Sequence, residues 1–172
     1  MKHALLSLFI VALVSFSAHA ATVLHMDLKT LSKEADAIVV VSVEDVQTEV
    51  KDGRVFSKAT FRTEDVWKGQ PMDTFSIRYL GGRHGNLVTR VPGLPMFAEG
   101  SREILFLESH PKHKGWAVLG LEQGRFVLKE DRVERSPDAH LHPISEDGKP
   151  VEMSEFPSDL KSFMAEVLGA NE

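Results

Sequence analysis

Residues 37–67 read AIVVVSVEDVQTEVKDGRVFSKATFRTEDVW, and this stretch decides the fold. Its first seven residues are mostly β-branched and apolar, which is typical of a strand buried on both faces. From Val43 onward apolar and polar residues alternate, so we expect one face of the strand to become exposed. Asp52-Gly53 separates two such runs and is the strongest short-range signal of a β-hairpin. The stretch therefore predicts a long antiparallel hairpin, with a bulge near residues 65–67.

The segments on either side of this hairpin predict further strands and a helix near each end. Leu28, Leu31 and Ala35 recur at helical spacing after Asp27, a suitable N-cap. A C-terminal helix is expected to begin at Ser154 or Ser158 and to end at Gly169. Strands are expected over residues 74–80, 87–91, 102–108, 116–121 and 125–129.

These elements predict a mainly β fold, a small closed or nearly closed antiparallel barrel with a short N-terminal helix and a C-terminal helix. Strands so close in sequence, without helices between them, pair antiparallel, and closure into a barrel would remove exposed edges. We expect the barrel over residues 21–135. Residues 136–172 are expected to form an irregular segment followed by the C-terminal helix, packed on the barrel.

The first twenty residues have the pattern of a signal peptide. Lys2 precedes an apolar run that ends at Phe16, and Ala18-His19-Ala20 fits a cleavage site. The run is shorter than the roughly 20 apolar residues of a membrane-spanning helix. The alternative is a buried N-terminal helix. The sequence favours export to the periplasm or the medium, cleavage after Ala20, and a mature chain with no membrane span.

The composition of the 172-residue chain excludes several functions. It contains no cysteine, so disulfides, thiolate nucleophiles, cysteine-ligated zinc and iron–sulfur clusters are all excluded. The net charge of −5 argues against a general nucleic-acid partner, which would require a basic surface. No cofactor motif is present, since the glycines of residues 81–85 lead into a strand-like run rather than a helix that could hold phosphate.

The first half of the chain resembles the netrin-like module, the OB-type barrel of the tissue inhibitors of metalloproteinases. The resemblance is carried by residues 35–40, 43–50 and 61–66 and by the turn Trp67-Lys68-Gly69. It implies the barrel fold and an association with proteases. Those inhibitors chelate the protease zinc through an N-terminal cysteine, whereas this chain has Ala21 after the expected cleavage site. Two motifs, Tyr79-Leu80-Gly81-Gly82 and Val91-Pro92-Gly93, also resemble those of exported bacterial proteins.

The connection over residues 81–100 is the best candidate for a functional site. Its large apolar side chains either form an exposed patch that binds a partner or plug one end of the barrel. Nearby basic and aromatic residues give the mixed character of binding surfaces. The candidate binding residues are Arg78, Tyr79, Arg83, His84, Arg90, Leu94, Met96 and Phe97.

No catalytic motif is present, so we expect a non-enzymatic module that binds a protein or peptide. Two alternatives remain open. One is a protease inhibitor or protease-associated module, which rests on the fold. The other is a metal-dependent enzyme that uses His140 and His142, two residues apart and therefore on one side of a strand. The sequence does not define an oligomeric state.

Overall fold

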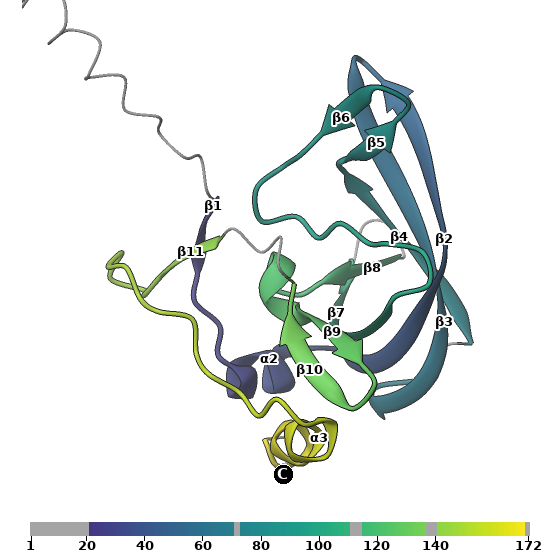
Figure 1. Ribbon diagram of the computed structural model, residues 1–172. Helices are drawn as coiled ribbons and strands as arrows, with labels where there is room; N and C mark the ends of the chain where they lie inside the picture. The colour runs from purple at the N-terminus through teal and green to yellow at the C-terminus, as the bar shows by residue number, and fades with distance from the viewer. Residues whose placement is uncertain (1–20, 71–72, 111–114, 137–140, 171–172) are drawn as a thin grey trace, which may run out of the picture.

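Figure 1 shows the computed structural model of the chain, in which a curved β-sheet is flanked by two helices. The structure describes residues 21–70, 73–110, 115–136 and 141–170. The mainly β fold with a helix near each end is confirmed. The strands of the large sheet are β2 (Ala37–Lys51), β3 (Arg54–Lys68), β4 (Thr74–Leu80), β7 (Arg102–His110), β8 (Gly115–Val118), β9 (Arg125–Lys129) and β10 (Arg132–Arg135).

The hairpin of β2 and β3 organises the large sheet, as the sequence predicts. Asp52 and Gly53 have φ angles of 52° and 70°, the left-handed conformation that a tight two-residue turn requires. The pairing shifts between Ile38, which faces Lys68, and Val39, which faces Val66. Trp67 is therefore the extra residue of a bulge, which confirms the bulge expected near residues 65–67.

The large sheet curls but does not close into a barrel. Its antiparallel strand order is β10-β9-β7-β2-β3-β4, with β8 paired to β7. Within the described residues, no ladder joins β4 to β8 or β10. The edge of β10 is instead covered by the chain that leads into the C-terminal helix, because Val133 N–H donates to Ser158 O and Leu160 N–H donates to Asp131 O. The described strands therefore do not form a closed barrel, and the OB-type barrel stays a prediction.

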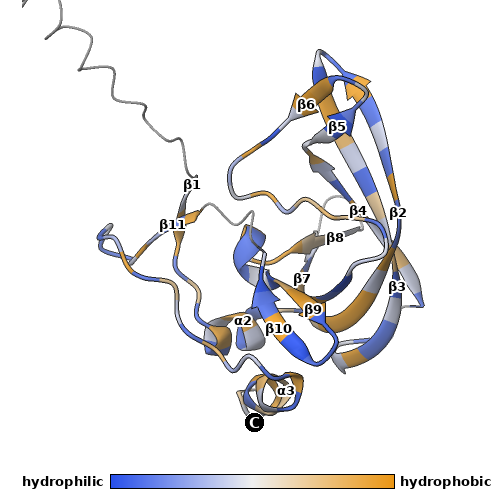
Figure 2. Ribbon diagram, viewed as in Figure 1, coloured by the Kyte–Doolittle hydropathy of each residue, from blue (hydrophilic) through white to orange (hydrophobic). Residues whose placement is uncertain are grey.

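Both faces of the sheet are covered. On one face, Ile38, Phe106 and Phe126 pack against Leu31 and Phe163 of the helices α2 (Leu28–Glu34) and α3 (Leu160–Gly169). On the concave face, Val39, Val41 and Leu105 pack with Phe61 and Phe97. Figure 2 shows hydrophobic residues along β7, β9 and the first part of β2. Hydrophilic residues are mixed with them toward the turn between β2 and β3. The apolar run of β2 is thus buried on both sides, as predicted.

Each helix begins at an aspartate cap. Asp27 accepts from Thr30 N–H at 2.7 Å, which confirms the expected cap of α2. The cap of α3 is Asp159, which accepts from Ser162 N–H at 2.9 Å, so the predicted starts at Ser154 or Ser158 are wrong. Gly169 is the last helical residue rather than the residue after the helix.

Two short sheets lie beside the large one. Strands β1 (Ala21–Leu24) and β11 (Leu141–Ile144) pair in parallel, although residues 136–150 were expected to be irregular. Gln123 supports this pair, because its side chain donates to Leu24 O and accepts from Met26 N–H. Strands β5 (Gly82–His84) and β6 (Leu87–Thr89) form a small hairpin over the far end of β2 and β3. Before β9, the 3₁₀ helix η2 (Leu121–Gly124) follows β8.

Candidate binding surface and the connection that supports it

The structure separates the predicted binding residues into a buried and an exposed group. Phe97 is only 7% exposed and meets the rings of Phe61 and Tyr79 edge-on, with ring centroids 4.8 and 5.5 Å apart. Met96 packs against the same cluster, and Leu94 is half-buried. This part of the connection packs on the concave face of the sheet. Phe97 therefore belongs to the core and not to an exposed patch.

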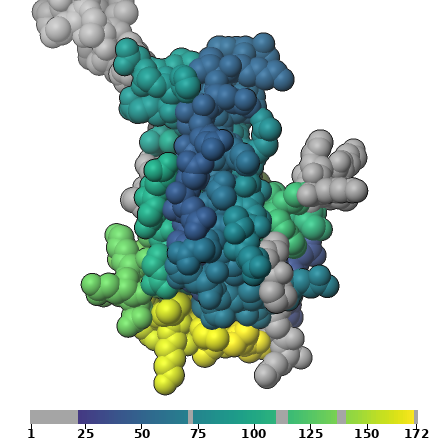
Figure 3. Space-filling view, turned by 90° about the vertical axis from the view of Figure 1, so that its right-hand side faces the viewer, coloured from purple at the N-terminus to yellow at the C-terminus, as the bar shows by residue number. Residues whose placement is uncertain are grey.

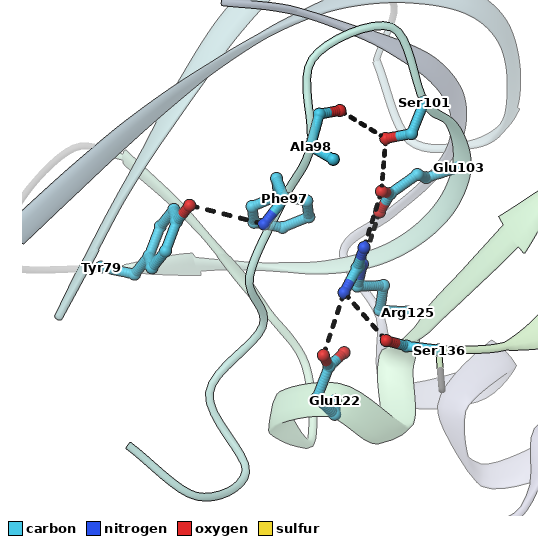
Figure 4. A network of polar contacts seen from close by, with 8 residues as sticks. All are labelled: Tyr79, Phe97, Ala98, Ser101, Glu103, Glu122, Arg125 and Ser136. Atoms are coloured by element: carbon cyan, nitrogen blue, oxygen red, sulfur yellow. Dashed lines mark hydrogen bonds and ion pairs between the residues drawn. The ribbon is translucent and has the colours of Figure 1, made fainter. Parts of the chain in front are cut away.

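A buried ion network lies beneath Phe97 (Figure 4). Arg125 donates to both carboxylate oxygens of Glu103, at 2.6 and 2.8 Å, and to Glu122 Oε1 at 3.0 Å. The side chains of Arg125, Glu103 and Glu122 are 6%, 0% and 2% exposed. The guanidinium lies 5.0 Å from the centre of the Phe97 ring. Burial disfavours the charge of Arg125, but its hydrogen bonds to Glu103 and the two carboxylates raise its pKa above the usual value.

The network fixes the end of the 81–100 connection to the sheet. Ser101 Oγ donates to Glu103 Oε1 and to Ala98 O, both at 2.8 Å, and Glu122 N–H donates to Gly93 O at 3.0 Å. Sequence reasoning missed this network. One signal was available, since Glu103 stands at an inward position in phase with the apolar residues 105 and 107. A carboxylate at such a position requires a buried cationic partner.

The middle of the connection, the β5–β6 hairpin, is anchored on the β2–β3 hairpin. Gly82 lies so close to β3 that a Cβ at this position would overlap Ser57 Oγ. The φ angle of Gly82, +127°, also favours glycine. Thr89 Oγ1 accepts from Val55 N–H at 2.9 Å. Thr48 Oγ1 and His84 Nδ1 are 3.0 Å apart. His84 is thereby held by the scaffold.

Exposed apolar side chains gather at this end of the molecule. Five large apolar side chains are exposed among the described residues, and three of them are Val50, Leu87 and Val88, at 46%, 38% and 46%. Leu87 pairs with His84 and faces β2, whereas Val88 pairs with Arg83 on the opposite side of the small hairpin. Figure 3 shows the two hairpin ends together at the top, at the far end of the molecule from α3.

We define the distal surface by these exposed side chains of the two hairpin ends: Val50, Lys51, Asp52, Arg54, Arg83, Leu87 and Val88. Of the residues predicted from sequence, Arg83 belongs to it, His84 supports it, and Arg90 follows it directly. Arg78 lies apart, because it projects from the opposite face of β4 to its neighbour Tyr79. There it contacts Glu49 at 2.6 Å beside a cavity of about 210 Å³, lined also by Phe56 and Lys58.

Among the described residues, no three His, Cys, Asp or Glu side chains lie close enough together to hold a metal ion. His142 is exposed and lies opposite Thr22 in the β1–β11 pair, while His140 lies outside the described residues. His25 contacts Ser154 Oγ at 2.9 Å and lines a second cavity of about 350 Å³, between β1, α2 and residues 145–151. No helix within the described part of the chain has the length and apolarity needed to cross a membrane.

Comparisons of the chain with models of protein families, with curated proteins and with solved structures found no match.

Proposed function

We propose that the protein is an exported, non-enzymatic binding module that recognises a protein or peptide partner through its distal surface. The observation that carries the proposal is the clustering of Val50, Leu87 and Val88, three exposed apolar side chains on adjoining hairpin ends. Exposed apolar groups with charged neighbours are typical of interaction sites.

The anchoring of the connection supports this proposal. The β5–β6 hairpin is fixed to the scaffold at Gly82 and Thr89, and the following chain is fixed through Phe97 and the Arg125 network. A surface that is ordered before binding loses less conformational entropy when a partner arrives. Export rests on the leader-like pattern of residues 1–20, which lie outside the described residues.

The proposal is tested by partner capture from envelope extract with the tagged, exported protein. The test variant replaces Val50, Leu87 and Val88 with serine. The matched control replaces Leu24 and Leu168, the two other exposed large apolar residues of the described chain, with serine. Circular dichroism first establishes that all three proteins are folded. We expect a partner to be recovered by the wild type and the control and lost with the test variant. Equal recovery of every protein by all three would refute the proposal.

One observation favours a second candidate, a protease inhibitor. After cleavage at the expected site, the new N-terminal residue Ala21 would belong to β1, which is held by β11 and by Gln123 without any disulfide. Such a terminus could present its amine and carbonyl to a protease zinc in a fixed position. Inhibition of secreted metalloproteases by the mature protein, abolished by one added N-terminal residue, is the expected result. Absence of inhibition, or insensitivity to the added residue, would exclude this mechanism.

A further inference from the structure

We infer that the segment bound by the distal surface is acidic, an inference that rests on the proposed function. Residues 47–58 and 78–90, which contain the two hairpin ends, carry six Lys and Arg residues and two carboxylates, a net charge of +4. The whole chain has a net charge of −5, so the remainder carries −9. This asymmetry creates a local positive field that attracts an anionic partner and repels other basic surfaces.

Several cations at this end of the described chain have no carboxylate partner. Within the described residues, Lys51, Arg54, Lys58 and Arg83 make no ion pair. Exposed cations on other strands and turns do pair with carboxylates, as in Arg62–Glu44, Arg102–Glu64, Lys129–Glu134 and Lys149–Asp147. At the distal surface, cations without an ion pair thus lie beside exposed apolar side chains.

The arrangement fits a protein segment in which acidic and apolar side chains are interspersed. Arg83 and Val88 are cross-strand neighbours on one face of the β5–β6 hairpin, so a cation and an apolar group lie side by side. Surfaces that insert into membranes typically use Trp, Phe and Leu on one continuous face. Here the exposed apolar groups are two valines and one leucine, which favours a peptide over a lipid surface.

The test measures fluorescence anisotropy of labelled twelve-residue peptides added to the protein, exported and processed with its own leader. The probe consists of Glu-Leu-Ser repeats, and the comparison peptides replace every Glu with Gln or with Lys. The test variant is Arg54→Glu/Arg83→Glu. The control, Lys29→Glu/Lys161→Glu, makes the same change in net charge on exposed residues of α2 and α3.

We expect the Glu peptide to bind at least about tenfold more tightly than the Gln peptide at low salt, and to weaken as salt is raised. The test variant should lose about tenfold or more of this affinity, while the control should change it by less than about twofold. Equal binding of the Glu and Gln peptides, or wild-type affinity in the test variant, would overturn the inference.

Two further measurements separate the possible failures. Vesicles of equal parts phosphatidylglycerol and phosphatidylcholine are added in place of the peptides. Binding to these vesicles that depends on Arg54 and Arg83, without peptide binding, would assign the surface to membranes and refute the acidic segment. The charge variant is also used in the capture experiment. A partner that the charge variant retains and the serine variant of Val50, Leu87 and Val88 loses would support the proposed function. That result would refute the inference that the partner is acidic.

Discussion

Replacement of Arg125 by Met should destabilise the fold more than replacement of any surface arginine. The substitution leaves the carboxylates of Glu103 and Glu122 buried without their cation, and breaking a buried ion pair in this way costs about 3–5 kcal/mol. For a domain of this size, that corresponds to a fall in Tm of roughly 6–20 °C. Arg102→Met is the matched control. Its bridge to Glu64 is half-exposed, and its loss should cost less than about 1 kcal/mol.

Urea unfolding followed by circular dichroism gives both free energies of unfolding, and hydrogen exchange locates the local effect. We expect the amides of residues 94–101 to exchange faster in Arg125→Met, because Phe97 loses its contact with the guanidinium and Glu103, the partner of Ser101, loses the cation that holds it. The triple variant Arg125→Met/Glu103→Met/Glu122→Met should recover much of the lost stability, since apolar residues of similar size can replace a buried ion network. A loss below about 1 kcal/mol in the single variant, or a triple variant no more stable than the single one, would refute this reasoning.

Three further changes test other parts of the fold. Phe97→Ala should cost about 3–5 kcal/mol in urea unfolding, because it removes a buried ring, whereas an exposed residue would cost little. Gly82→Ala should destabilise the β5–β6 hairpin in hydrogen exchange, and adding Ser57→Ala should restore only part of the loss, because the φ of +127° stays unfavourable. The Thr30 N–H donated to Asp27 lowers the pKa of that carboxyl, so its contribution is complete above about pH 4 and is lost as the pH falls through the lowered pKa. Asp27→Ala should cost about 1 kcal/mol at pH 7 and less at pH 3, while Asp27→Asn should keep the cap and lose this pH dependence.

Local sequence patterns predict the elements of this fold better than its long-range pairings. The turn at Asp52-Gly53, the bulge at Trp67 and the cap at Asp27 depend on a few neighbouring residues, and each is confirmed. The pairing of β1 with β11 joins residues more than a hundred positions apart, and no local pattern predicts it. The described strands also do not close into a barrel, because the edge of β10 is satisfied by residues 158–160 instead of by another strand.

The candidate site was predictable in part for the same reason. Residues 81–100 stand out by their glycines, prolines and apolar side chains, but their composition does not decide which of them face the core. Arg78 and Tyr79 are adjacent in sequence and lie on opposite faces of β4, so their adjacency in sequence does not bring their side chains together. The pairing of Glu103 with Arg125 joins two strands whose order in the sheet had to be known first.

The fold itself explains why its distal end is the exposed one. Helices α2 and α3 and the packed connection cover the sheet only as far as the buried run of β2, which ends near Val43. Beyond Val46, the part of the described chain that lies over the two long strands is the small β5–β6 hairpin, and β2 becomes progressively exposed. A chain without cysteine cannot hold such an extension by a disulfide, so close backbone packing at Gly82 and the hydrogen bond from Val55 to Thr89 hold it. The packing of the fold does not account for the exposed apolar groups and the cations without carboxylate partners at this end, which supports the proposal that the distal surface binds a partner.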